Sequence, residues 1–213
     1  AVARAMVLRP KVLLFDEPLS NIDSKLRRSM RNDIRRLQQE SGITAIYVTH
    51  DQAEALAVSD EIILIRSGTI EQQGPPHSLY HAPRTAFVAN FIGESNVIDA
   101  ELKGVGGKPE LAVGDARIPW AGMNSIPPGD GPVTLSLRPE IIELGEPDSS
   151  APTALAGIIA QRAYMGPVVE YSVETRAGTL FTRAPAHTHQ FQVHDRVDLH
   201  IRPEEIIIIP NTA

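Results

Sequence analysis

The stretch VLLFDEPLSNID, residues 12–23, decides the fold class of the first part of the chain. It begins with four consecutive apolar residues, which is typical of a short strand buried on both faces of a parallel sheet. The acidic pair Asp16-Glu17 stands at the carboxyl end of that strand. In open parallel sheets ligands bind beyond the carboxyl ends of the strands. The stretch therefore predicts an α/β domain with a site near Asp16 and Glu17.

A helix and a second strand follow this stretch. Residues 24–40 carry apolar side chains at helical spacing, and Asp23 and Ser24 are candidate N-caps. The basic residues within 25–36 are expected to form a solvated helix face. Residues 44–48 form a second β-type run that ends in Thr49-His50. Because the connections are short, this order predicts a right-handed βαβ unit with two parallel strands.

A further helix and a hairpin are expected before the pattern changes. Asp51 and Glu54 have the spacing of an N-cap and its capping-box partner. The apolar run at residues 61–65 turns at Ser67-Gly68 into another extended segment, which predicts a hairpin that closes the sheet.

The second part of the chain has a different pattern. From about Asn96 onward, short extended runs are separated by Gly and Pro clusters, which is typical of a small β-barrel or sandwich. We therefore place a domain boundary between residues 1–94 and residues 95–213. Within the second region, the pattern strand-Arg-Pro-Glu-strand occurs at residues 134–142 and again at 198–207, which indicates two similar β-units sharing one barrel.

Composition narrows the function classes. The chain has 213 residues and a net charge of -6, which leaves little general attraction for nucleic acid or anionic lipid. Cysteine is absent, which excludes disulfides and thiolate metal sites and fits a reducing compartment. No apolar run approaches the roughly 20 residues that cross a bilayer.

The residues that carry chemistry are Asp16, Glu17 and His50, which follow two successive strands. A carboxylate at this place can hold Mg²⁺ through water, a second can orient and polarise an attacking water, and a histidine can contact a transferred phosphoryl group. In the plainer interpretation, Asp16 and Glu17 cap the next segment and His50 is a satisfied strand-end residue. Either feature alone fits both interpretations.

Taken together, these residues lie in a specific signature. Residues 13–23 resemble the Walker B strand, catalytic glutamate and D-loop of ABC ATPases, and residues 47–55 resemble their H-loop. Residues 96–213 resemble the accessory TOBE domain of importer-type subunits. The resemblance implies an α/β fold, the C-terminal half of a P-loop NTPase (RecA-like) parallel-sheet domain, followed by an all-β OB-like domain.

The resemblance also implies a role for each matched residue, with ATP and Mg²⁺ as cofactors. Glu17 is the implied general base and His50 the implied γ-phosphate contact. Asp16 is the carboxylate implied to organise Mg²⁺, with the contact expected through water. The residues expected to contact nucleotide or the second motor across the dimer are Asp16, Ser20, Asn21 and Asp23.

The implied partners are a second ATPase subunit in a homodimer, transmembrane permease subunits and, indirectly, a periplasmic or extracellular solute-binding protein, with no nucleic acid. The implied location is cytoplasmic, peripheral on the inner face of the cell membrane. The segment FIGESN, residues 91–96, favours the polyamine, iron or phosphonate branch over sugar importers.

The departure from the family is a missing motif. No Gly-x-x-x-x-Gly-Lys-[Ser/Thr] occurs in the 213 residues, and the Leu-Ser-Gly-Gly signature is missing too. We therefore expect an N-terminally truncated subunit that is inactive alone. Two alternatives remain: a small-molecule-binding regulatory module, and an OB-type nucleic-acid binder, which ranks last because residues 96–213 hold few aromatics for base stacking.

Overall fold

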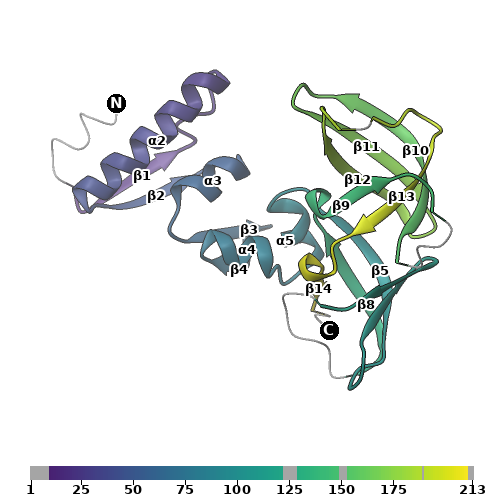
Figure 1. The fold of residues 1–213 in the computed structure, drawn as a ribbon. Coiled ribbons are helices and arrows are strands. Elements are labelled where there is room, and N and C mark those ends of the chain that lie inside the picture. Colours follow the sequence, from purple (N-terminus) through teal and green to yellow (C-terminus); the bar gives the residue numbers. More distant parts are fainter. Residues whose placement is uncertain (1–9, 122–128, 149–152, 189, 211–213) are drawn as a thin grey trace. The chain divides into compact units, whose positions relative to one another are not determined.

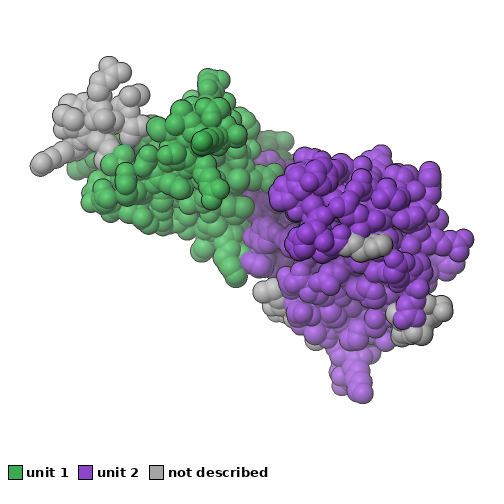
Figure 2. All heavy atoms as spheres, turned by 45° about the horizontal axis from the view of Figure 1, so that its top comes forward, with its two compact units in different colours: residues 1–79 green, residues 80–213 purple. Residues whose placement is uncertain are grey.

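The computed structural model describes residues 10–121, 129–148, 153–188 and 190–210. The chain divides into two compact units, residues 1–79 and residues 80–213 (Figure 2). In the described residues, no helix is long and apolar enough to span a membrane.

The first unit contains the expected βαβ arrangement. Strand β1 (Val12–Asp16) is followed by helix α2 (Ser24–Ser41) and strand β2 (Thr44–Val48) (Figure 1). The two strands pair in parallel, with Val12 opposite Thr44 and Asp16 opposite Val48. The predicted parallel pair is confirmed, and its register brings both carboxyl ends to the same edge.

Local signals fix both ends of α2. The Asp23 carboxylate accepts a hydrogen bond from the Leu26 backbone N–H at 3.0 Å, which satisfies one of the free donors at the helix start. Gly42 ends the helix at φ 64, a left-handed conformation that glycine adopts without a Cβ penalty.

The expectation that β1 is buried on both faces is wrong for the described residues. Leu13 is 7% exposed, whereas its neighbour Leu14 is 74% exposed and Ile46 of β2 is 54% exposed. Successive side chains of a strand point to opposite faces, so one face of this two-stranded sheet is covered and the other is open.

The hairpin is confirmed, but its place in the sheet is not as expected. Helix α3 (Gln52–Val58) leads to strands β3 (Ile62–Arg66) and β4 (Thr69–Gly74), which pair antiparallel. They form a two-stranded sheet of their own and do not extend β1–β2. Helix α4 (Pro76–His81) then crosses the division between the units.

The second unit begins with helix α5 (Ala86–Phe91) and is otherwise β-rich, as expected. It has two five-stranded antiparallel sheets, with the strand orders β14-β8-β5-β6-β7 and β9-β13-β10-β11-β12. The strands are β5 (Asn96–Lys103), β6 (Glu110–Val113), β7 (Ala116–Pro119), β8 (Gly131–Leu137), β9 (Ile142–Gly145), β10 (Leu155–Tyr164), β11 (Val168–Thr175), β12 (Gly178–Pro185), β13 (Arg196–Ile201) and β14 (Ile207–Ile209).

The internal repeat corresponds to these two sheets, and each repeat gives its last strand to the other. In the first repeat, β8 is followed by a 3₁₀ turn at Pro139–Ile141 and by β9, which pairs with β13 of the second sheet. In the second repeat, β13 is followed by a 3₁₀ turn at Pro203–Glu205 and by β14, which pairs with β8 of the first sheet. Neither sheet is complete without a strand from the other repeat.

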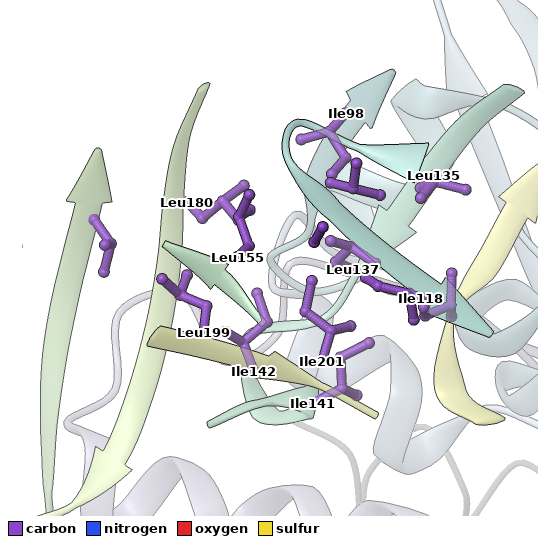
Figure 3. Packing of buried hydrophobic residues seen from close by; sticks show 14 of the residues in the cluster. Ile98, Ile118, Leu135, Leu137, Ile141, Ile142, Leu155, Leu180, Leu199 and Ile201 are labelled. Atoms are coloured by element: carbon purple, nitrogen blue, oxygen red, sulfur yellow. The ribbon is translucent and has the colours of Figure 1, made fainter. Parts of the chain in front are cut away.

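A single hydrophobic core joins the two sheets. Figure 3 shows apolar side chains from both, including Leu135 and Leu137 of β8 and Leu155 of β10, gathered in the space between the strands. Leu135, Leu137 and Leu155 are fully buried. The two repeats therefore fold as one unit, because burying this apolar area is the main favourable contribution to folding.

The start of the second unit lies before the boundary that the sequence predicts. Contacts divide the chain between Leu79 and Tyr80, whereas the sequence places the boundary at residues 94/95. The carbonyls of Gly93 and Glu94 accept hydrogen bonds from Arg138 of the second unit, at 3.1 Å each. These contacts explain the difference, and the 94/95 boundary stays a prediction.

Candidate functional site

The candidate site lies where β1 and β2 end. Glu17 follows β1, and its backbone N–H donates to the carbonyl of Val48 at 2.9 Å, which continues the pairing of the two strands by one step. Its φ is 43, a left-handed conformation that costs a non-glycine residue on the order of 1–3 kcal/mol. Such outliers gather at functional sites, so this one supports placing the site at Glu17.

Glu17 and His50 are in direct contact. The Nδ1 atom of His50 lies 3.0 Å from Oε1 of Glu17, although 33 positions separate the two residues in the chain. The hydrogen bond with Glu17 and the charge of that carboxylate raise the pKa of His50 above its ordinary value. Both side chains remain accessible, with His50 73% exposed, so a ligand can reach them.

A hollow surrounds this pair. Its lining comes from the segment after β1, from α2, from the segment between β2 and α3, and from α3 itself. The lining residues are Glu17, Ser20, Arg27, Thr49, His50, Asp51 and Glu54. The hollow is thus polar and holds charges of both signs, which suits a polar, charged ligand better than an apolar one.

The remaining predicted residues lie around the hollow with different local roles. The Ser20 hydroxyl donates to the carbonyl of Glu17 at 3.0 Å and closes the turn after β1. Asp23 caps α2 through its carboxylate. Asp16 and Asn21 are exposed. Of the six predicted residues, the structure brings Glu17, Ser20 and His50 to the hollow, and the functional roles of all six stay predictions.

The fit to Mg²⁺ depends on Asp16. Among the described residues, no group of three or more His, Asp or Glu side chains is arranged to hold a metal ion. Mg²⁺ in nucleotide sites is held by one or two carboxylates together with substrate phosphates and water. Asp16 is an exposed carboxylate at a strand end and fits that chemistry. It suits a site in which Mg²⁺ is held by Asp16 together with nucleotide phosphates and water, and not a site built from protein ligands alone.

The sequence did not predict the roles of Glu54 and Arg27, which line the same hollow as Glu17 and His50. Glu54, expected only as a capping-box partner, is buried and accepts hydrogen bonds from Tyr47 and Thr49. Arg27, expected on a solvated basic helix face, instead reaches Asp51 and lines the hollow. The available signal for Glu54 was its spacing from Asp51, which fits a helix start equally well, and nothing in the sequence distinguished Arg27 from its basic neighbours.

Comparison with known proteins places this geometry in context. Residues 135–209 match the TOBE domain family. The chain is 49% identical to the Fe(3+) ions import ATP-binding protein FbpC 1 of Rhizobium meliloti (strain 1021), over 87% of this chain and 51% of that protein. It is 44% identical to the Fe(3+) ions import ATP-binding protein FbpC of Brucella melitensis biotype 1, over 98% of this chain and 58% of that protein.

The βαβ unit with an acidic pair and a histidine at its strand ends precedes the segment that matches the TOBE domain family. The identity to the two relatives extends over most of this chain. The chain is thus similar, over most of its length, to importer ATP-binding proteins, and residues 135–209 match the TOBE domain family.

The extent of these similarities is also informative. The chain spans about half the length of the curated relatives it matches. Among solved structures, a crystal form of the cytoplasmic molybdate-binding protein ModG covers 54% of this chain and 96% of its own, with a TM-score of 0.43 and 16% identity.

Proposed function

We propose that this chain supplies the hydrolytic residues of the ATP-hydrolysing subunit of an ABC importer, within the C-terminal half of a P-loop NTPase domain. The observation that carries the proposal is the contact between Glu17 and His50, 3.0 Å apart at the ends of two parallel strands. The relatives support it, because they are named as ATP-binding importer proteins.

In this proposal Glu17 is the general base. Its carboxylate orients a water and accepts the proton as that water attacks the terminal phosphoryl group. His50 holds Glu17 through Nδ1 and keeps Nε2 as a second hydrogen-bonding group for the γ-phosphate. The hydrolytic roles thus fall to two side chains held together by the pairing of β1 with β2.

The other predicted residues receive supporting roles. Asp16 binds Mg²⁺ through water, and the ion would neutralise phosphate charge when bound. Ser20, Asn21 and Asp23 form the segment that meets nucleotide and the second ATPase subunit of a homodimer. Asn21 and Asp23 are exposed and therefore accessible to such a partner.

We further propose that the transported solute is ferric ion. The names of the relatives favour Fe(3+) among the polyamine, iron and phosphonate solutes that the sequence suggests. The partners are then a membrane-embedded permease and, through it, a solute-binding protein outside the membrane. The subunit works on the cytoplasmic face, where ATP is available.

The test uses a chimera in which the N-terminal portion of the Rhizobium meliloti relative precedes residue 1 of this chain. We expect Glu17→Gln to lower the steady-state rate of phosphate release by about 10²–10⁴-fold while ATP binding is kept, because the amide keeps the shape but cannot accept the proton. The matched control is Glu40→Gln on the exposed end of α2, which should leave the rate unchanged. Wild-type turnover in the Glu17 variant would remove Glu17 from the role of base.

A further inference from the structure

Arg27 of α2 connects the two segments that form the hollow. Its Nη2 donates to the carbonyl of Ile22 at 2.9 Å, in the segment that follows β1. Its Nη1 lies 3.5 Å from Oδ2 of Asp51, in the segment that follows β2. One guanidinium thus contacts both segments, because its fixed fork presents several donors in a plane.

The buried carboxylate of Glu54 lies next to the Arg27 guanidinium. Glu54 is 3% exposed and accepts hydrogen bonds from the hydroxyls of Tyr47 and Thr49, at 3.0 Å each. Its other oxygen, Oε1, lies 4.0 Å from Nε of Arg27. A buried charge is costly unless it is paired and hydrogen-bonded, and the neighbours of Glu54 supply both.

These contacts hold the two residues that flank His50 in the chain. Thr49 precedes His50 and is held by Glu54, whereas Asp51 follows His50 and is held by Arg27. The Thr49 hydroxyl also accepts a hydrogen bond from the Asp51 backbone N–H at 3.0 Å, which closes the turn around His50. The backbone at His50 is therefore fixed on both sides, while its ring stays exposed.

We propose that Arg27, supported by Glu54, is a positioning residue that ties the segment after β1 to the segment after β2 and so holds His50 against Glu17. The proposal deepens the proposed function and rests on it for its consequence, since the pair that Arg27 positions is the hydrolytic pair. The geometric claim itself can be tested without hydrolysis.

A positioning role and a purely electrostatic role of Arg27 predict changes of opposite sign in the pKa of His50, so the two roles can be distinguished. The charged groups around His50 are Glu17, Asp51 and Glu54, with Arg27 lining the same hollow. If Arg27 acted only as a nearby cation, removing it would raise the pKa of His50, because a like charge disfavours protonation. If Arg27 positions the pair, removing it separates His50 from Glu17 and the pKa of His50 falls toward its ordinary value.

The experiment is an NMR titration of the His50 ring in the 213-residue chain, with the signal assigned by a His50→Gln variant. We expect the pKa of His50 to fall in Arg27→Met. We expect Glu17→Gln to lower that pKa in the wild-type background and to lose most of this effect in the Arg27→Met background. The matched control is Arg36→Met on the same helix, whose contact is with exposed Asp33, and it should leave the titration unchanged.

Arg27→Lys provides a second variant that keeps the charge. A single ammonium cannot reproduce the fork that reaches both Ile22 and Asp51, so the pKa of His50 should fall here too. Amide chemical shifts of residues 12–16 and 44–48 report whether the β1–β2 pair is intact. If Arg27→Met does not fold, Arg27→Lys tests the positioning role in its place. A folded variant in which the pKa of His50 rises or stays constant would overturn the proposal. Loss of ATP hydrolysis in the chimera is a separate measurement, so failure of the proposed function is distinguishable from failure of the positioning role.

Discussion

At the scale of single residues, the repeated Arg-Pro-Glu sequence shows how environment decides what a side chain does. Arg138 is 3% exposed and stacks on the ring of Tyr80, with 4.1 Å between the guanidinium carbon and the ring centroid. Burial lowers the pKa of Arg138. At the matching position, the Arg202 side chain is 40% exposed and bonds to Glu205. The carbonyls that accept hydrogen bonds from Arg138 are those of Tyr80, Ala89, Gly93 and Glu94.

We predict that Arg138→Met lowers the free energy of unfolding of the second unit by about 3 kcal/mol. The reason is that one buried and three partly buried carbonyls lose their donor, and an unsatisfied buried group costs about 1–3 kcal/mol. Arg202→Met is the matched control and should cost about 1 kcal/mol or less, as for an exposed ion pair. Urea titration followed by fluorescence of Trp120, the one tryptophan of the sequence, measures both. Equal losses of unfolding free energy in the two variants would contradict the larger stabilising role of Arg138.

At the scale of elements, helix α2 contributes both to the fold of the first unit and to the lining of the hollow. Its N-cap Asp23 belongs to the segment expected to meet the second motor, and its first turn ends at Arg27, which lines the hollow. The cap and the basic residue lie four positions apart, and the Arg27 backbone N–H donates to the Asp23 carbonyl at 2.8 Å. A disturbed helix start is therefore expected to move Arg27 as well.

We predict that Asp23→Ala destabilises the first unit by about 1 kcal/mol, because the free N–H groups at the helix start lose their acceptor. Asp23→Ser should restore most of the stability, since serine also caps helices well. Asp33→Ala, on an exposed part of the same helix, should stay within about 0.5 kcal/mol of wild type. Amide hydrogen exchange across residues 24–41 measures the effect, and identical exchange in the Asp23→Ala variant and the wild type would exclude a capping role.

At the scale of the whole molecule, the question is where the independently folding part begins. We predict that residues 80–213 fold alone with the stability that the second unit has in the full chain. A piece comprising residues 95–213 should be less stable, because Arg138 then lacks its acceptors at residues 80, 89, 93 and 94. Trp120 fluorescence in urea compares the two pieces. Equal stability would favour the boundary at 94/95 that the sequence predicts.

The 213-residue chain is also expected to bind Mg-ATP weakly. Most ground-state affinity in nucleotide motors comes from the backbone amides and lysine of a phosphate-binding loop, and that motif is missing from these residues. Calorimetric titration should give a Kd closer to millimolar, roughly -4 kcal/mol, than to micromolar, roughly -8 kcal/mol. A micromolar, magnesium-dependent site would mean that another part of this chain cradles the phosphates.

Much of the local structure follows from the sequence alone. The sequence predicted the βαβ order, a cap at Asp23 or Ser24, the hairpin after residue 61 and the Arg-Pro-Glu repeat, because these features depend on side-chain periodicity and on residues a few positions apart. The placement of Glu17 and His50 at one edge was also readable, since parallel strands bring their carboxyl ends together.

Only the tertiary structure decided which distant groups meet. The repeat predicted two similar units, but not that β9 and β14 each complete the other repeat's sheet. The basic pattern of α2 predicted a solvated face, but not that Arg27 contacts both Ile22 and Asp51. These outcomes depend on how whole surfaces are buried and on which polar groups then need partners, and neither is encoded in the spacing of neighbouring residues.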